Sequence, residues 1–415
     1  MKPIPKLLLN WITRDGKLII ASRGISTFAK SSVAIFIALY LEKIGFSLIQ
    51  IGAFLSVSIA GSAFLTFLVS LVSEKIGRKR LLILFTLISA ASGVALIFID
   101  SFLPIMFIAF IGGIHEQMGP AQPLEQAGLT DAATTEKRTD LFAIYRIVAV
   151  GGSAIGALAA GLPAIYQRSF GIGEIDAFRV MFAIFAFCLL VGALLYTLLS
   201  SSVEVSSDKQ RWVNPFRLPS RRLIFTLTGL FSLDSFAGSL FPQSLAAYWF
   251  YTRFGIELEA LAMVFFASHL LAAVSLWVAA KLSNRIGLIN TMVFTHIPCS
   301  LFLIGAAFSP NVSIAIVFWQ LRAFFSRMDV PTRDSYTMSM VQPDERVAMA
   351  GINTVGRSAT GTIAPSIATA LWQAFSATVP LVSHAILKIA YDLSLYFMFR
   401  NVKPPQEIEN EQATR

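Results

Sequence analysis

The sequence contains little charge and almost no cysteine. Only 14% of its 415 residues are charged and 55% are hydrophobic, whereas about a quarter of the residues of a soluble domain are charged. The two cysteines, Cys188 and Cys299, exclude a disulfide framework and a cysteine-based metal site. The apolar residues form long continuous runs, which argue against a soluble enzyme, a disordered chain or a coiled coil. Such runs also exclude a transmembrane β-barrel, whose strands alternate apolar and polar residues.

Motifs for chemistry are also missing. The chain has no Gly-x-x-x-x-Gly-Lys-Ser/Thr segment, so it encodes no ATP-binding motor. Its four histidines lie in different apolar runs without the spacing of metal ligands, and no nucleophile–base pattern is visible. We therefore expect neither an enzyme nor a cofactor.

The apolar runs are long enough to cross a membrane, which takes about 20 residues for a helix. They predict an all-α polytopic membrane protein with twelve transmembrane helices. The expected spans are 18–41, 47–72, 81–100, 103–126, 141–165, 178–200, 222–251, 257–281, 289–309, 311–330, 347–373 and 376–399.

The basic residues predict the orientation of these spans. Of the 33 Lys and Arg residues, those in the expected outer loops are Lys43, Arg168, Arg179 and Arg253. Most of the other Lys and Arg residues lie in the loops expected on the opposite side of the membrane. Loops enriched in Lys and Arg are usually cytosolic. We expect a multi-pass protein of the cell membrane, surrounded by lipid, with both termini in the cytosol. The formal charge of +9 then reflects topology and implies no nucleic-acid partner.

The chain is an internal duplication. Gly45, Lys75 and Gly77 meet Gly255, Arg285 and Gly287 at an offset of about 210, and Pro123 and Arg138 meet Pro331 and Arg346 at a similar one. A nearly constant offset over six spans predicts two parallel repeats around a midplane site. The expected parts are an N-terminal bundle (1–200), a cytosolic linker (201–221), a C-terminal bundle (222–400) and a cytosolic tail (401–415).

The loop after the second span carries a recognisable motif. Residues 70–79 read Ser-Leu-Val-Ser-Glu-Lys-Ile-Gly-Arg-Lys, which resembles the major facilitator loop motif Gly-x-x-x-Asp-Arg/Lys-x-Gly-Arg/Lys-Arg/Lys. Ser70 and Glu74 replace the Gly and the Asp of that motif. With the 6+6 duplication, the chain resembles the major facilitator superfamily, specifically a poorly characterised prokaryotic branch. The resemblance implies two six-helix bundles, alternating access and a cavity lined by spans 1, 4, 7 and 10.

Ionisable residues inside the spans are candidates for function, because charge at membrane depth is costly. We assign substrate binding or proton coupling to Lys30, Glu116, Gln117, Arg146, Asp234, Arg322 and Arg357. Burial favours a neutral carboxyl group and a nearby cation favours the ionised form, so Glu116 or Asp234 is the expected proton site. The alternative is that these charges form buried pairs that only set packing. Arg23 is expected to snorkel to the inner surface, and Lys388 and Asp392 to pair with each other.

A second set of charges lies near the expected cytosolic ends of the helices. Basic loop motifs need nearby acceptors, so we expect these residues to form a gate between the halves. The predicted gate residues are Glu74, Lys75, Gly77, Arg78, Glu125, Arg138, Arg285, Asp329, Arg333, Asp334 and Arg346.

Basic residues outnumber acidic ones at membrane depth, which favours an organic anion as substrate if the surplus faces the cavity. If those side chains snorkel instead, this inference fails. An apolar wall for an amphipathic solute is expected from Tyr145, Phe241, Tyr248, Trp249 and Trp319. Glycines in spans 5 and 11 indicate either close helix packing or the flexible helices typical of exporters.

Together these features predict a secondary active transporter of a small organic solute. We expect a monomer that exchanges protons for the solute and exports it. Sodium-coupled or facilitated uptake remains an alternative, as does a membrane sensor on the same fold that transports nothing.

Overall fold

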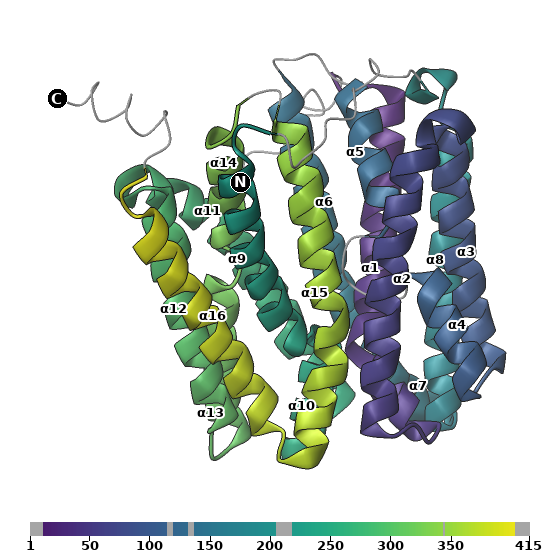
Figure 1. Ribbon diagram of the computed structural model, residues 1–415. Coiled ribbons are helices and arrows are strands. Elements are labelled where there is room, and N and C mark those ends of the chain that lie inside the picture. The colour runs from purple at the N-terminus through teal and green to yellow at the C-terminus, as the bar shows by residue number, and fades with distance from the viewer. Residues whose placement is uncertain (1–10, 114–118, 132–136, 205–217, 343–344, 403–415) are drawn as a thin grey trace, which may run out of the picture. The chain divides into compact units, whose positions relative to one another are not determined.

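The computed structural model of the protein describes residues 11–113, 119–131, 137–204, 218–342 and 345–402 (Figure 1). Every regular element within these ranges is a helix. The chain divides into two compact units.

The first unit consists of Met1–Phe46, Val57–Gln210 and Glu257–Phe266. Within it, α1 packs against α6 and α8, and α3 packs against α8. The helix α2 begins in the range of the second unit and continues into the first. The elements from α1 to the 3-10 turn η3 are α1 (Arg14–Lys43), α2 (Leu48–Ile76), α3 (Arg78–Phe98), α4 (Phe102–Gly112), α5 (Ala121–Asp131), α6 (Arg138–Ala159), α7 (Leu162–Phe170), α8 (Glu174–Thr197) and η3 (Ser201–Glu204).

The second unit consists of Ser47–Ser56, Arg211–Ile256 and Ala267–Arg415. Here α9 packs against α15 and α16, and α12 packs against α13, α14 and α16. Its elements are α9 (Arg221–Leu240), α10 (Gln243–Phe254), α11 (Leu258–Ile286, which begins in the first unit), α12 (Leu288–Ala307), α13 (Val312–Phe325), α14 (Asp329–Ser339), α15 (Arg346–Ala374) and α16 (Thr378–Phe399).

Small residues let the helices within each unit approach closely. A Cβ atom added at Gly156 of α6 would lie 2.2 Å from the carbonyl oxygen of Phe28 on α1. In the second unit, one added at Gly356 of α15 would lie 2.7 Å from Thr228 Cγ2 on α9. Both glycines therefore meet the close-packing expectation for spans 5 and 11, because a larger residue would separate the two helices.

Four expected spans are divided between two helices. Span 5 is interrupted only at Ala160–Gly161 and span 7 only at Phe241–Pro242, whereas spans 4 and 10 have wider breaks. Span 4 was expected to be continuous over 103–126, but α4 ends at Gly112, before Gly113 in a left-handed conformation, and α5 begins only at Ala121. Span 10 was expected to end at 330, but α13 ends at Phe325 and α14 begins at Asp329. Pro331 lies in the first turn of α14, where no intrahelical donor is lost, so the helix continues through the expected loop.

Nine helical segments of the described residues are long and apolar enough to cross a membrane. They correspond to nine of the twelve expected spans. The other three coincide with the broken pairs α4–α5 and α13–α14 and with α15, which is 29 residues long but carries several polar side chains.

Candidate functional site

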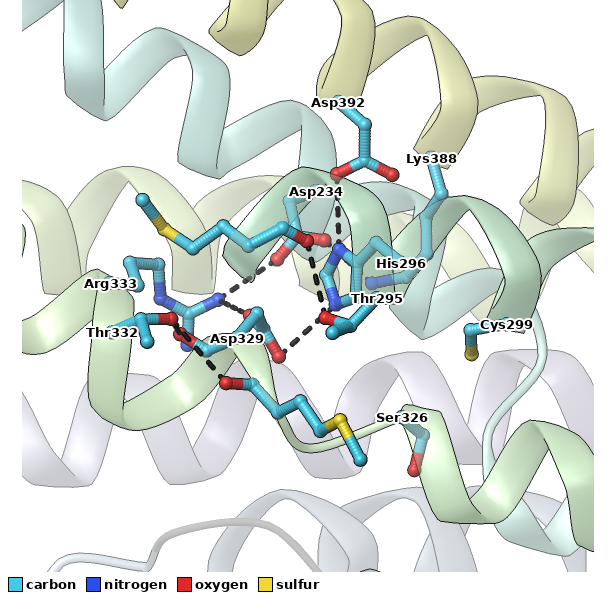
Figure 2. A network of polar contacts seen from close by, with 12 residues as sticks. Asp234, Thr295, His296, Cys299, Ser326, Asp329, Thr332, Arg333, Lys388 and Asp392 are labelled. Atoms are coloured by element: carbon cyan, nitrogen blue, oxygen red, sulfur yellow. Dashed lines mark hydrogen bonds and ion pairs between the residues drawn. The ribbon is translucent and has the colours of Figure 1, made fainter. Parts of the chain in front are cut away.

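Six ionisable side chains form an ionic network inside the second unit. Its members come from four helices: Asp234 from α9, His296 from α12, Asp329 and Arg333 from α14, and Lys388 and Asp392 from α16 (Figure 2). Two pairs are spaced i, i+4, so that each of α14 and α16 presents two network residues on one face.

Asp234 is held by two cations. Lys388 Nζ donates to its Oδ1 at 2.6 Å, and Arg333 Nη1 donates to its Oδ2 at 3.2 Å. The same Arg333 atom also donates to Asp329 Oδ2 at 2.7 Å. These contacts join α9, α14 and α16 through charge.

His296 joins the other two carboxylates. Its Nε2 lies 3.1 Å from Asp329 Oδ1, and its Nδ1 lies 3.2 Å from Asp392 Oδ1 (Figure 2). Asp392 Oδ2 has no hydrogen-bond partner in the described part of the chain. The imidazole therefore links α12 to both α14 and α16.

The network is almost completely removed from solvent. Asp234 is 4% exposed, Asp329 3%, His296 1% and Asp392 0%. Protein groups rather than water must therefore compensate these charges. Removing one partner of such a buried pair costs about 3–5 kcal/mol, because the other partner stays buried without compensation.

The first unit holds a smaller cluster around Glu125 of α5, which is 1% exposed. Its carboxylate accepts hydrogen bonds of 2.5 Å from the hydroxyls of Tyr145 and Tyr196, and Arg23 Nη1 lies 3.5 Å from Oε2. Arg23 Nη2 also donates to Gln122 Oε1 at 2.9 Å. The expectation that Arg23 snorkels is wrong, because its guanidinium pairs with a buried carboxylate of its own unit.

The network combines residues that the sequence analysis had separated. Asp234 was assigned to the substrate cavity and Asp329 and Arg333 to a gate, yet all three are in direct contact. The expected Lys388–Asp392 pair is also wrong. Lys388 binds Asp234, and Asp392 binds His296, because α9 and α12 supply closer partners than the neighbouring turn of α16.

The other predicted substrate residues lie apart from these two clusters. Lys30 lies close to Gly119, because a Cβ atom added at that glycine would be 3.0 Å from Lys30 Nζ. Arg146 is exposed on α6. The Arg322 guanidinium lies over the Trp319 ring, 4.6 Å from its centroid. Arg357 is half-buried on α15, in the electrostatic field of Arg333 and Asp234. None of these four cations forms a salt bridge to an acidic side chain of the described residues. The predicted residues Glu116 and Gln117 lie outside the described residues.

Most other predicted gate residues lie at helix ends. Gly77 and its repeat Gly287 have φ values of +97° and +85°, which suit glycine at the tight turns before α3 and α12. Arg346 Nε donates to the carbonyl oxygen of Met338 at 3.0 Å. Three more, Lys75, Arg285 and Asp334, are exposed. The side chains of Glu74 and Arg138 lie outside the described part of the structure.

Two carboxylates at helix starts were missed by the sequence analysis. Glu204 accepts from the backbone N–H groups of Arg78 at 2.6 Å and Lys79 at 3.1 Å, and so caps α3. Glu345 accepts from the backbone of Ser220 at 3.0 Å. Burial opposes its ionisation, yet the hydrogen bonds it accepts hold the pKa of Glu345 below its usual range.

The predicted aromatic wall forms a chain of ring contacts inside the second unit. Phe241 contacts Trp249 at 6.3 Å between ring centroids, Trp249 contacts Phe250 at 4.7 Å, and Phe250 contacts Trp319 at 5.6 Å. These rings are buried, so packing accounts for their contacts. Tyr145 belongs instead to the Glu125 cluster of the first unit.

His296 is the most important residue that the sequence analysis missed. It was considered only as a metal ligand, and the described residues contain no group of three His, Cys, Asp or Glu side chains that could hold a metal ion. A histidine within an apolar span is a functional candidate in its own right. That signal was present in the sequence, but its partners on α14 and α16 were not.

Comparisons with known proteins complete the description. Residues 19–326 match the family model described as Major Facilitator Superfamily. The uncharacterized membrane protein YJR124C of Saccharomyces cerevisiae is 22% identical over 388 residues, which cover 85% of this chain and 87% of that protein.

Three solved structures resemble the chain at identities that show the fold alone. A bacterial homolog of the human lysosomal transporter Spinster has a TM-score of 0.77 and 14% identity, covering 92% of this chain and 96% of its own. The nucleoside transporter NupG has a TM-score of 0.74 and 12% identity, with coverages of 93% and 99%. A D-xylose–proton symporter has a TM-score of 0.74 and 14% identity, with coverages of 92% and 97%.

Proposed function

The chain belongs to the Major Facilitator Superfamily, and on that premise we propose that it is a proton-coupled secondary transporter of a small organic solute. It works by alternating access as a monomer in the cell membrane, with both termini in the cytosol, and it exports the solute. Several proteins of similar fold are transporters, and one is a D-xylose–proton symporter.

The observation that carries the proposal is the charge composition of the ionic network. Three buried carboxylates (Asp234, Asp329 and Asp392) face two permanent cations, Arg333 and Lys388. An uncompensated charge is costly inside a buried network. This one is balanced only when it binds a proton, which is the property that proton coupling requires.

The substrate class follows from cations that have no acidic partner. Lys30, Arg322 and Arg357 are half-buried, and none of them has a salt-bridge partner within the described ranges. A partly desolvated cation without a counter-charge favours an anionic ligand. These residues support an organic anion as the substrate.

The proposed direction of transport is export. It depends on glycines in α6 and α15, the helices that correspond to spans 5 and 11. Gly151 and Gly351 have no atoms within 4 Å of an added Cβ, whereas Gly156 and Gly356 are in close contact. Glycines beyond those needed for packing are consistent with helices that bend during export.

The proposal is tested with purified protein in proteoliposomes. A thermal-stability screen against small carboxylates and organic phosphates first identifies a stabilising solute, because a ligand that binds only the folded state raises its stability. We expect an imposed pH gradient to drive flux of that solute. We expect Asp234→Asn to abolish this response, because it removes one of the three negative charges that the bound proton balances. The matched control is Asp140→Asn, which removes an exposed carboxylate in the first turn of α6.

Other outcomes identify the alternatives. Flux driven by a sodium gradient but not by a pH gradient would replace the proton with sodium. Binding of the solute without flux would identify a sensor. Glu116 remains a predicted proton site, and Glu116→Gln in the same assay tests it. If Glu116→Gln and Asp234→Asn both respond normally to the pH gradient, neither residue carries the coupling proton.

A further inference from the structure

We infer that His296 and Asp392 share one exchangeable proton, and that this proton is the one that the transport cycle binds and releases. The first statement concerns the protein alone. The second rests on the proposed function and moves the coupling proton away from Asp234.

The contacts of His296 require one more proton than a neutral histidine and two ionised carboxylates supply. Both ring nitrogens face carboxylate oxygens, Nε2 at 3.1 Å from Asp329 and Nδ1 at 3.2 Å from Asp392. A neutral imidazole carries one N–H group, and an ionised carboxylate only accepts. Two good contacts therefore need either an imidazolium or a protonated carboxyl group. Without that proton, one nitrogen lone pair would face an oxygen lone pair.

The arrangement of charges places this proton on the Asp392 side. Asp329 also accepts from Arg333 at 2.7 Å, so it is compensated whether or not the imidazole is charged. Among the described residues, Asp392 has no salt-bridge partner other than His296, and its second oxygen is buried without a hydrogen bond (Figure 2). Asp392 is thus the carboxylate that changes most when the proton leaves.

The other charged and titratable groups around the pair are accounted for. Lys388 and Asp234 neutralise each other at 2.6 Å. The groups that interact electrostatically with His296 or Asp392 are Asp234 on α9, Asp329 on α14, and His384, Lys388 and Tyr391 on α16. Three further cations act on these groups: Arg333 pairs with Asp234 and Asp329, Arg357 on α15 interacts with Asp234 and Asp329, and Arg322 on α13 interacts with His384. Within the six-residue network, the proton brings the total charge to zero, and its loss leaves one negative charge.

Loss of the proton has a structural consequence. A neutral His296 can donate to only one of its two carboxylates, and Asp392 becomes a fully buried anion without an ion-pair partner among the described residues. That state is relieved by separating α16 from α12 at this level or by admitting water between them. Proton release is thereby linked to a change in helix packing within the second unit.

The corresponding cluster of the first unit lacks this property. Glu125 accepts from two tyrosine hydroxyls and lies beside the permanent cation Arg23, so every contact it makes is satisfied in its ionised form. No additional proton is required there. In the part of the chain that the structure describes, these two clusters therefore differ, and the pair that requires a proton lies in the second unit.

The proton can be observed without transport. The full chain, labelled with ¹⁵N-histidine and placed in lipid, is measured by solid-state NMR from about pH 5 to about pH 8, where histidine titrates. Infrared spectra of the same samples report protonated carboxyl groups. We expect near neutral pH either an imidazolium signal from His296 or a carboxylic-acid band from Asp392. The His296 resonance is assigned by its loss in His296→Gln.

Two variants make the result specific. Asp392→Asn removes the excess negative charge, so we expect the signal of the bound proton to be lost near neutral pH. His384→Gln removes another buried histidine of α16 and should leave that signal unchanged. The inference is overturned if the wild type shows neither signal near neutral pH, or if Asp392→Asn leaves the observed one unchanged. If His296→Gln does not fold, the His296 resonance is assigned by eliminating those of the other three histidines with His115→Gln, His269→Gln and His384→Gln.

Transport then tests the second statement. In proteoliposomes, Asp392→Asn should move the solute found in the stability screen but no longer move protons with it. A wild type that shows the proton signal but no flux would refute the proposed transport and leave the shared proton intact. A variant whose solute and proton fluxes both equal those of the wild type would show that the proton is bound but not used.

Discussion

Replacing Lys388 with methionine tests whether charge pairing holds the ionic network together. Lys388 Nζ lies 2.6 Å from Asp234 Oδ1, and Asp234 is 4% exposed. At an effective dielectric constant of about 20, two unit charges at this distance attract each other by about 6 kcal/mol, part of which is cancelled by desolvation. Because Arg333 still contacts Asp234, we expect Lys388→Met to lower the free energy of unfolding by about 3 kcal/mol, the low end for a broken buried pair.

A double-mutant cycle separates charge from packing. Asp234→Asn alone leaves Lys388 buried without its counter-charge, whereas Lys388→Met combined with Asp234→Asn removes both charges together. We expect the double variant to be more stable than the sum of the single effects by about 1–3 kcal/mol, the range of coupling for residues in contact. The surface pair of Lys43 and Glu174, 3.0 Å apart, provides the control. Because it is partly exposed, Lys43→Met should cost at most about 1 kcal/mol.

The assay is reversible unfolding in mixed micelles, followed by tryptophan fluorescence. The reasoning is refuted if Lys388→Met costs no more than Lys43→Met. It is also refuted if the two network substitutions are additive, because then the close contact between Lys388 and Asp234 would contribute no coupling energy.

Three further predictions concern packing and helix ends. Glu204→Ala removes the cap of α3 and should lower the unfolding free energy by about 1 kcal/mol in the same assay. Gly156→Ala places a Cβ atom 2.2 Å from Phe28 O and should cost about 1–3 kcal/mol, whereas Gly151→Ala, with nothing within 4 Å, should not destabilise. The pKa of Glu345 is lowered in the folded protein, so its carboxylate stabilises the fold above the usual carboxyl pKa, and this stabilisation is lost as the pH falls through the lowered pKa. Glu345→Gln should therefore reduce the loss of unfolding free energy at acidic pH.

The fold class could be predicted from the sequence because membrane spans depend on local composition. Runs of apolar residues and the loop motif at residues 70–79 were sufficient to predict the family and an all-helical membrane fold. The family match and the similar solved structures confirm both. The breaks at Gly113 and at Ser326–Met328 were not predicted. Both segments contain polar residues, among them Glu116 and Arg327. A polar side chain does not by itself end a helix, so composition did not show where the helices stop.

The partners within the candidate site could not be predicted from the sequence. Spacing along one helix suggested that Lys388 pairs with Asp392, but the i, i+4 rule considers a single helix. In the folded unit, Lys388 pairs with Asp234 on α9, and Asp392 pairs with His296 on α12. Similarly, Asp329 and Arg333 resembled loop charges because the extension of α14 through Pro331 was not foreseen.

The sequence analysis considered Asp234 and Glu116 as proton sites because both are acids at membrane depth. It passed over His296, since a single histidine has no spacing pattern to match. Its role depends on two carboxylates that are 33 and 96 residues away in the chain. Contacts of that range are set by helix packing and leave no periodic signal in the sequence.

The most direct test of proton coupling is the proton flux that accompanies solute movement. Proteoliposomes containing a pH-sensitive dye and the wild-type chain are exposed to the solute found in the stability screen, without an imposed pH gradient. We predict that solute movement through the wild type changes the internal pH and that solute movement through Asp392→Asn does not. Solute movement through the wild type without any pH change would contradict proton coupling, and an unaltered pH change in Asp392→Asn would contradict the assignment of the proton to the His296–Asp392 pair.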